Sequence, residues 1–224
     1  MGSRPEGGPG GVVLFDLDGT LIDSEDLILA SYRHTMQRHL GHVPPDDAWR
    51  SGIGTPLIVQ MRRFARDEAD VAGMIRTYTE HNLTHHDDLV RPFAGVREAL
   101  AILRAAGLHL AIVTSKKARA TYMGLRRCAL SADWFGTIVT AESVDRYKPH
   151  PAPVWRAVAD LGREPADAVF VGDSPHDMRA GRAAGVLTAA ALWGPFGRPE
   201  LEATEPDAWL EAPDDIPALL GLAV

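Results

Sequence analysis

Two carboxylates stand two residues apart near the start of the chain, in the segment Asp16-Leu17-Asp18-Gly19-Thr20. A carboxylate attacks phosphorus well only where a divalent cation offsets its repulsion from an anionic phosphate, so nucleophile and metal ligand must lie together. Asp16 suits both roles, and Asp18 is close enough to protonate a leaving group and then to activate water. Gly19 lets the backbone turn closely around phosphoryl oxygens. Taken alone, the segment is equally compatible with an ordinary turn.

Two further polar segments supply the hydroxyl groups and the positive charge that such chemistry needs. Thr114 and Ser115 follow an apolar run at residues 110–113, and Lys148 lies beyond a second run at residues 138–139. We expect Thr114 at the start of a helix, where unpaired N–H groups and the helix dipole favour anions. Ser115 would assist Thr114 in binding the substrate. Lys148 would neutralise both the nucleophile and the transferring group. Each segment also has a simpler interpretation, as an N-cap or a solvated loop lysine.

The apolar run 169–171 is followed by a fourth polar segment, Gly172-Asp173-Ser174-Pro175-His176-Asp177. Asp173 is a hard oxygen ligand of the kind that Mg²⁺ takes in proteins. Asp177 lies one helical turn further along and is a second candidate ligand, or alternatively the residue that orients Lys148 or a metal-bound water. The candidate ligands for Mg²⁺ are therefore Asp16, Asp18, Asp173 and Asp177.

The apolar runs themselves predict the strands of a parallel sheet. Residues 12–15 are wholly apolar and are followed by carboxylates, a pattern typical of a strand buried on both faces. Similar runs occur at residues 108–113, 137–140, 168–171 and 186–192, and helical patterns lie between them at residues 95–106, 151–161 and 175–184. This alternation predicts a doubly wound, Rossmann-like α/β sheet. Ligands bind beyond the carboxyl ends of the strands in such sheets, which is where the polar segments fall.

The stretch 23–90 interrupts this alternation. It contains helical patterns at residues 27–40, 57–65 and 70–83 and no convincing strand. We therefore predict an inserted α-helical cap at residues 23–90, between two parts of a catalytic core at residues 11–22 and 91–224. Residues 1–10 are rich in residues that resist regular structure and are expected to form a flexible leader.

In this order, the four polar segments resemble the motifs of the haloacid dehalogenase-like hydrolase superfamily, and specifically of its members with a helical cap. The resemblance covers about residues 11–221. It implies a Mg²⁺-dependent phosphatase with Asp16 as nucleophile, Asp18 as acid and base, and the backbone carbonyl of Asp18 as a further metal contact. Residues 172–181 and 192–197 resemble phosphoglycolate phosphatase and pyrophosphatase-type members. The implied substrate is a phosphoglycolate-like compound, a sugar phosphate or pyrophosphate.

Two other functions remain open from the sequence, namely a phosphoglucomutase-type phosphotransferase and a non-catalytic phosphate-binding module. The same fold and nucleophile serve several reactions, so the resemblance alone does not fix one. The presence of both Asp16 and Asp18 favours phosphoryl transfer over sensing, and also over dehalogenation, which needs no such acid. A phosphonatase is excluded because that reaction uses a cap lysine as a Schiff base, and residues 23–89 contain no lysine.

Substrate selection is expected to involve the cap loop at residues 50–57, which resembles the specificity loop of capped relatives. Arg50 would bind a second anionic group of the substrate, or else it is a surface arginine beside a turn. Lys116, in the first turns of the helix expected after Thr114, would approach the substrate phosphate. Two histidines and two aspartates at residues 85–88 resemble a metal cluster. Adjacent histidines on a helix point apart, however, so we predict a solvated helix end.

The composition excludes other classes of partner. The 224 residues carry a formal net charge of −7, so the overall field would repel nucleic acid and anionic membranes. No apolar run approaches the ~20 residues needed to cross a bilayer. The single cysteine, Cys128, excludes an internal disulfide and fits a reducing compartment. We therefore expect a cytoplasmic protein, monomeric or homodimeric, whose partner is a small phosphorylated metabolite.

Overall fold

The computed structural model describes residues 11–222, and its main element is a six-stranded sheet with the strand order β5-β4-β1-β6-β7-β8. The strands are β1 (Val12–Phe15), β4 (His109–Val113), β5 (Thr137–Val139), β6 (Ala168–Gly172), β7 (Leu187–Ala191) and β8 (Ala208–Leu210). Every neighbouring pair is parallel. Phe15 is paired with Ile112 on one side and with Val171 on the other, so β1, β4 and β6 end at the same level.

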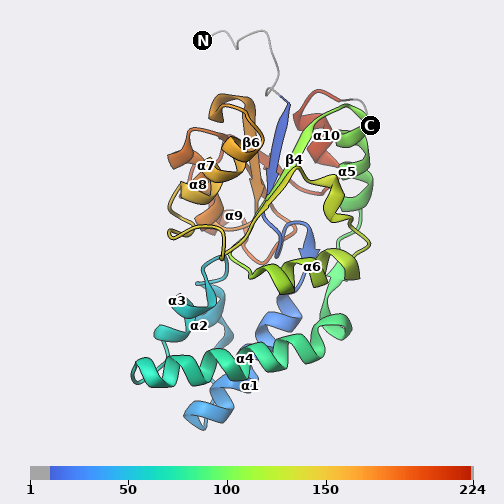
Figure 1. Cartoon of the computed structure of the whole chain (residues 1–224). Coiled ribbons are helices and arrows are strands. Elements are labelled where there is room, and N and C mark those ends of the chain that lie inside the picture. The colour runs from blue at the N-terminus through green and yellow to red at the C-terminus, as the bar shows by residue number, and fades with distance from the viewer. Residues whose placement is uncertain (1–10, 223–224) are drawn as a thin grey trace.

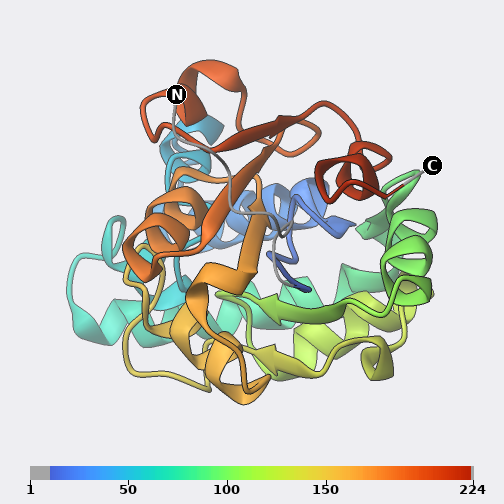
Figure 2. The same cartoon turned by 90° about the horizontal axis from the view of Figure 1, so that it is seen from above.

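Helices cover both faces of the sheet, as the view from above shows (Figure 2). The helices α5 (Val96–Ala105), α6 (Ala118–Arg127) and α10 (Asp215–Leu219) cover one face, and α7 (Ala152–Asp160) and α8 (Pro175–Ala184) cover the other. Alternate residues of β1 enter different cores, because Val13 packs in the cluster that contains Leu100 of α5 and Leu14 in the cluster that contains Val154 of α7. Burial on both faces explains why β1 is wholly apolar.

The cap consists of α1 (Glu25–Leu40), α2 (Asp46–Arg50), α3 (Leu57–Arg62) and α4 (Glu68–Leu89). These helices lie together beyond the carboxyl ends of the strands, in the lower part of Figure 1. An aromatic cluster holds them together, since the ring of Trp49 stacks on Tyr32 with centroids 4.8 Å apart and on Tyr78 with centroids 5.6 Å apart. The cap helices are therefore packed on one another, and their apolar cluster continues into the core through Met178, Ala190, Phe196 and Leu201.

Two short strands carry the chain into and out of the cap. Strand β2 (Ile22–Asp23) pairs with β3 (Arg91–Pro92) in antiparallel fashion, Ile22 opposite Pro92 and Asp23 opposite Arg91. Both connections between the cap and the core therefore run side by side.

The doubly wound sheet and the inserted helical cap predicted from the sequence are confirmed. The structure also contains short elements that the sequence patterns did not predict, namely β2, β3, β8, α2, α10, α9 (Arg198–Glu202) and two 3₁₀ turns at Ala132–Trp134 and Pro165–Asp167. The predicted leader at residues 1–10 lies outside the described residues. Over residues 11–222, none of the helices combines the length and the apolar character needed to span a bilayer.

The prediction of a solvated helix end at residues 85–88 is wrong for one residue. Asp87 and Asp88 are exposed, whereas His86 is fully buried. The reason is helical periodicity, because His86 follows the buried residues Tyr78 and Asn82 at intervals of four along α4.

Candidate active site

A buried lysine lies between two buried aspartates at the carboxyl end of β1. The Nζ of Lys148 is 2.8 Å from the Oδ1 of Asp16 and 2.6 Å from the Oδ1 of Asp177, and it also donates to the carbonyl oxygen of Val113 at 3.1 Å. The exposed fractions of the three charged side chains do not exceed 5%. Asp16 is fixed through its backbone, because its N–H donates to Val171 of β6. The sheet and Lys148 therefore hold the Asp16 carboxylate in one orientation.

Asp173 faces the same point from the end of β6. Its Oδ1 accepts a hydrogen bond of 2.8 Å from the Thr20 hydroxyl, and its Oδ2 is buried without a hydrogen-bond partner among residues 11–222. Carboxylate oxygens of Asp16, Asp173 and Asp177 lie within 4.8 Å of one another. An orphaned buried carboxylate oxygen beside two further carboxylates is a donor set that fits a divalent cation with oxygen ligands.

Asp177 has both of its oxygens occupied by protein groups. While Oδ1 accepts from Lys148, Oδ2 accepts from the backbone N–H and the hydroxyl of Ser174, at 3.0 and 2.6 Å. The bond from the Ser174 N–H, together with the bond of 3.3 Å that the Asp177 N–H donates to the Ser174 hydroxyl, forms a capping box at the start of α8. The Ser-x-x-Asp pattern at residues 174–177 is the local sequence signal of this box. Of the two roles considered for Asp177, the geometry favours orientation of Lys148 over direct metal ligation.

Asp18 is held from two sides. Its Oδ1 accepts from the hydroxyl of Ser24 and from the Nζ of Lys116, both at 2.5 Å. Ser24 was not among the residues predicted for the site; its hydroxyl binds Asp18 and makes no cap bond to α1. Lys116 was expected near the substrate phosphate, and here it pairs with the carboxylate beside the nucleophile.

Thr114 and Ser115 lie beyond β4, but the helix expected directly after Thr114 begins only at Ala118. The intervening residues form a turn in which the Thr114 hydroxyl accepts from the backbone N–H of Lys116 at 3.1 Å, which is a local alternative to helix formation. The Ser115 hydroxyl donates to the carbonyl oxygen of Gly54 in the cap loop at 2.6 Å. Ser115 therefore connects the core to the cap.

Two glycines allow the backbone to approach Asp173 closely. Gly19 has φ +85°, and a Cβ there would lie 2.5 Å from the Oδ2 of Asp173. A Cβ at Gly194 would lie 2.4 Å from the Cβ of Asp173. The neighbouring Trp193 is anchored because its Nε1 donates to the carbonyl oxygen of Thr20 at 2.9 Å. Residues 193–194 thus lie at the site; the segment 192–197 was noted in the sequence for its family resemblance, without a role in the site.

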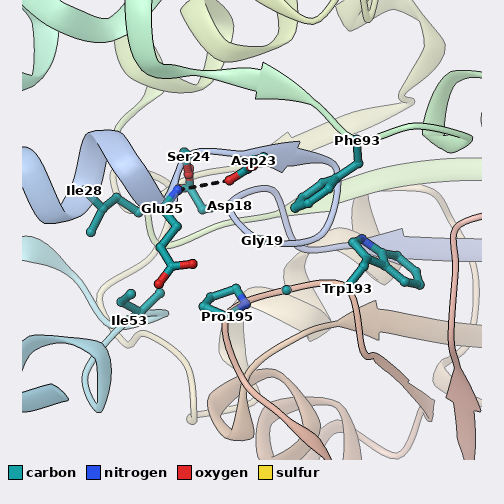
Figure 3. Close-up of a pocket in the computed structure, with 11 residues that line it drawn as sticks. Asp18, Gly19, Asp23, Ser24, Glu25, Ile28, Ile53, Phe93, Trp193 and Pro195 are labelled. Carbon is teal, nitrogen blue, oxygen red and sulfur yellow. Dashed lines mark hydrogen bonds between the residues drawn. The ribbon is translucent and has the colours of Figure 1, made fainter. Parts of the chain in front are cut away.

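Two cavities open beside Asp18. The large cavity, of about 430 Å³, lies between the cap and the core and contains Asp16, Asp18 and Thr114 in its wall. The small cavity, of about 90 Å³, is lined by Gly19, by the carboxylate-bearing residues Asp18, Asp23 and Glu25, and by Trp193 and Gly194 (Figure 3). Arg50 lines neither cavity, and its Nε donates at 2.7 Å to the Oε1 of Glu25, which lines the small one.

Burial and mutual repulsion raise the pKa values of two of the clustered carboxyl groups. Burial and the charge of Asp177 raise the pKa of Asp16 to about 7, although Lys148 acts in the opposite direction. Burial and the charges of Asp177 and Asp16 hold the pKa of Asp173 well above its usual range. Burial would lower the pKa of Lys148, but the charges of Asp16 and Asp177 raise it, so Lys148 remains a cation. One lysine thus faces three carboxyl groups, which favours the uptake of a further cation.

Comparisons with known proteins identify a family and several relatives that this chain resembles. A family model described as haloacid dehalogenase-like hydrolase matches residues 13–191. The pyrophosphatase PpaX of Anoxybacillus flavithermus is 38% identical over 210 residues, which cover 94% of this chain and 96% of that protein. The PpaX of Bacillus velezensis is 40% identical over 211 residues, with coverage of 94% and 96%. The chain is also similar to a crystal structure described as a predicted phosphoglycolate phosphatase from Haemophilus somnus 129PT, with a TM-score of 0.84 and 24% sequence identity. The match covers 93% of this chain and 97% of that chain, and at this identity it shows similarity of fold alone.

Proposed function

Because this chain belongs to the haloacid dehalogenase-like hydrolase family, we propose that it is a Mg²⁺-dependent phosphatase that hydrolyses a small phosphomonoester through an aspartyl-phosphate at Asp16. The observation that carries the proposal is the position of Lys148 between Asp16 and Asp177, with the free oxygen of Asp173 beside them. A buried cation fixed against a carboxylate nucleophile is the arrangement that phosphoryl transfer to a carboxylate requires.

In the first half of the reaction, a carboxylate oxygen of Asp16 attacks phosphorus while the bond from phosphorus to the leaving oxygen breaks. Asp18 donates a proton to that oxygen, and the product alcohol departs. In the second half, Asp18 accepts a proton from water as the water oxygen attacks the phosphorus of the aspartyl-phosphate. Inorganic phosphate is released, and Asp16 is restored as a carboxylate. The bonds from Ser24 and Lys116 hold Asp18 in place for both proton transfers.

Mg²⁺ would be held by Asp16, Asp173 and the backbone carbonyl of Asp18, with Asp177 beside it. When bound, it offsets the charge of the carboxylates and of the substrate phosphate. Thr114 and the backbone around Gly19 would donate to phosphoryl oxygens, and Lys148 would neutralise charge that develops during transfer.

The substrate is proposed to be a small phosphorylated metabolite. Pyrophosphate is suggested by the names of the PpaX relatives, and phosphoglycolate by the name given to the Haemophilus somnus structure. The buried Cys128 suits a reducing compartment, and we propose a cytoplasmic location and a monomeric or homodimeric state.

Phosphate release from pyrophosphate and from a broad panel of phosphomonoesters, measured with and without Mg²⁺, tests this function. We expect Mg²⁺-dependent release from at least one compound. A folded protein that binds Mg²⁺ but releases no phosphate from any compound would contradict it. Hexose 1-phosphate belongs in the panel with a trace of the corresponding bisphosphate, because formation of an isomerised sugar would identify a mutase.

A further inference from the structure

The large cavity is the place where the part of the substrate beyond the phosphate must lie. Asp16, Asp18 and Thr114 contribute to its wall, so a phosphate held against Asp16 directs its leaving group into this space. Its volume of about 430 Å³ is in the range of small-molecule sites. Pyrophosphate and phosphoglycolate are both far smaller than this cavity.

The cap contributes no charged side chain to the wall of the large cavity, among the residues that the structure describes. One face of α4 lines it, with residues at the spacing i, i+3, i+4, i+7 and i+8, namely Ile75, Tyr78, Thr79, Asn82 and Leu83. Further apolar surface comes from Ile28, Trp49, Ile53 and Leu57. The wall that faces the nucleophile across the cavity is thus uncharged and mainly apolar.

The polar groups of this wall are already partly engaged with the protein. The Gln60 amide donates to the carbonyl oxygen of Trp49 at 3.2 Å and accepts from Arg63 at 2.8 Å. The Asn82 amide donates to the Ser31 hydroxyl at 3.3 Å. Burial, reinforced by the nearby charge of Asp18, raises the pKa of Tyr78 above its usual range, so this hydroxyl stays neutral. None of these groups supplies a positive charge for a second anion.

The cations near the cavity are placed unfavourably for a second anionic group. Lys116 is paired with Asp18, and the guanidinium of Arg50 lies on Glu25 outside the cavity wall. Lys117 and Glu142 both line the cavity from the core and are both exposed to solvent. Their charges are of opposite sign and are screened by solvent, so together they attract an anion only weakly. Lys116, whose side chain is 11% exposed, is already paired with Asp18, so among residues 11–222 the wall offers no unpaired buried cation of the kind with which proteins usually recognise a carboxylate or a second phosphate.

The small cavity is also unsuitable for an anionic leaving group. The carboxylate-bearing residues Asp18, Asp23 and Glu25 line it together, as Figure 3 shows. A carboxylate or phosphate placed there would meet three carboxylates, of which only two are balanced by cations within the described part of the chain, Asp18 by Lys116 and Glu25 by Arg50. Both spaces beside the nucleophile thus disfavour a leaving group that carries negative charge.

We propose that the leaving group of the substrate is an uncharged alcohol with a mainly apolar carbon skeleton that fills the large cavity against α4. This inference rests on the proposed phosphatase function. The proposed substrate therefore differs from pyrophosphate and phosphoglycolate, the compounds that appear in the names of the relatives. The expected order of kcat/KM places a bulky, hydrophobic phosphomonoester above phosphoglycolate and pyrophosphate.

A series of primary alkyl phosphates tests the proposal, because their leaving alcohols have similar intrinsic reactivity. We expect kcat/KM with Mg²⁺ to rise about tenfold or more from ethyl phosphate to cyclohexylmethyl phosphate as apolar surface is buried. Cyclohexylmethyl phosphate should also exceed phosphoglycolate and pyrophosphate. If either anionic compound is hydrolysed at least as well, the proposal is overturned while the phosphatase function stands. Absence of phosphate release from every compound would instead remove the phosphatase function, and the proposal with it.

A lysine placed in the cavity wall provides an independent check. Ile75→Lys should lower kcat/KM for cyclohexylmethyl phosphate about tenfold and raise it for phosphoglycolate, because it buries a cation opposite the nucleophile. Val59→Lys is the matched control, since Val59 is exposed on α3 and lines neither cavity. Leu83→Lys on the same face of α4 replaces Ile75→Lys if that variant does not fold. If a folded wall variant kept the same ratio of kcat/KM for cyclohexylmethyl phosphate to kcat/KM for phosphoglycolate as the unmodified protein, the proposal would be overturned.

Discussion

The Ser115 hydroxyl donates a hydrogen bond of 2.6 Å to the carbonyl oxygen of Gly54 and so joins the end of β4 to the cap loop. Gly54 has φ +94°, and a Cβ there would lie 2.9 Å from the Oγ of Ser174, so the loop approaches the core on both sides of the nucleophile. This contact belongs to a closed arrangement of cap and core, in which the reacting groups are shielded from bulk water.

Loss of this contact should weaken closure. We expect Ser115→Ala to lower kcat/KM about fivefold, since a net hydrogen bond contributes about 1 kcal/mol. Steady-state kinetics on the best substrate measure the effect. Ser51→Ala is the control, because the Ser51 hydroxyl bonds only within the exposed cap surface. Equal kinetics for Ser115→Ala and the control would show that the bond is not used during turnover.

Replacement of the nucleophile should abolish turnover and leave the fold intact. Asp16→Asn is nearly isosteric, but an amide is a poor nucleophile, so kcat should fall about 1000-fold or more. The exposed Asp26 provides the control Asp26→Asn, which should retain full activity. Residual activity of more than a few per cent in folded Asp16→Asn would place the nucleophile elsewhere.

Substitutions of Asp173, in the loop before α8, and of Asp177, in α8, should change the Mg²⁺ requirement of the enzyme to different extents. Asp173 has a free buried oxygen, so Asp173→Asn should raise the Mg²⁺ concentration needed for half-maximal activity by about 10- to 100-fold. Asp177 is bonded to Lys148 and Ser174, so Asp177→Asn should lower kcat with a much smaller change in Mg²⁺ requirement. Mg²⁺ titrations of activity distinguish the two. Identical shifts in both variants would assign Asp177 to the metal.

The stability of the metal-free protein should fall as the pH rises. The pKa of Asp16 rises from 3.8 to about 7 on folding, so the folded state binds this proton more tightly than the unfolded state. The resulting stabilisation is complete below about pH 4 and is lost as the pH rises through 7. Mg²⁺ favours the ionised carboxylate, so the increase in Tm on adding Mg²⁺ should be larger at pH 8 than at pH 6.

Thermal melts at several pH values, with chelator or with Mg²⁺, measure this dependence. The Asp16→Asn variant carries no titrating group at this position and should show a smaller loss of Tm between pH 6 and pH 8. A Tm gain from Mg²⁺ that does not change over this pH interval would contradict the assignment of Asp16 as a protonated group in the metal-free site.

The positions of Asp16 and Asp173 could be predicted because they depend on one rule of parallel sheets, that the carboxyl ends of neighbouring strands share an edge. The bonds that orient these side chains could not be read from local pattern. Thr20 and Asp173 are 153 residues apart in sequence, and Ser115 and Gly54 are 61 apart. Only the closed fold brings such groups together.

Other differences have local causes. The helix after Thr114 starts late because the Thr114 hydroxyl binds the N–H of Lys116 and favours a turn. Strand β8 escaped detection because its three residues are too few to show a period. Arg50 was a candidate for binding substrate, but Glu25 lies 2.7 Å from it, a partner that the loop sequence does not reveal.

The pairing of Ile22 with Pro92 and of Asp23 with Arg91 also has an evolutionary consequence. Because the chain leaves and re-enters the sheet domain through adjacent points, the segment between them can change in length or sequence without moving any strand of the sheet. Exchange of this segment between homologues offers a direct route to altered selectivity, since the recipient would keep the nucleophile, lysine and aspartates that its own sheet positions. The two short strands are thus a natural junction for building chimaeric enzymes.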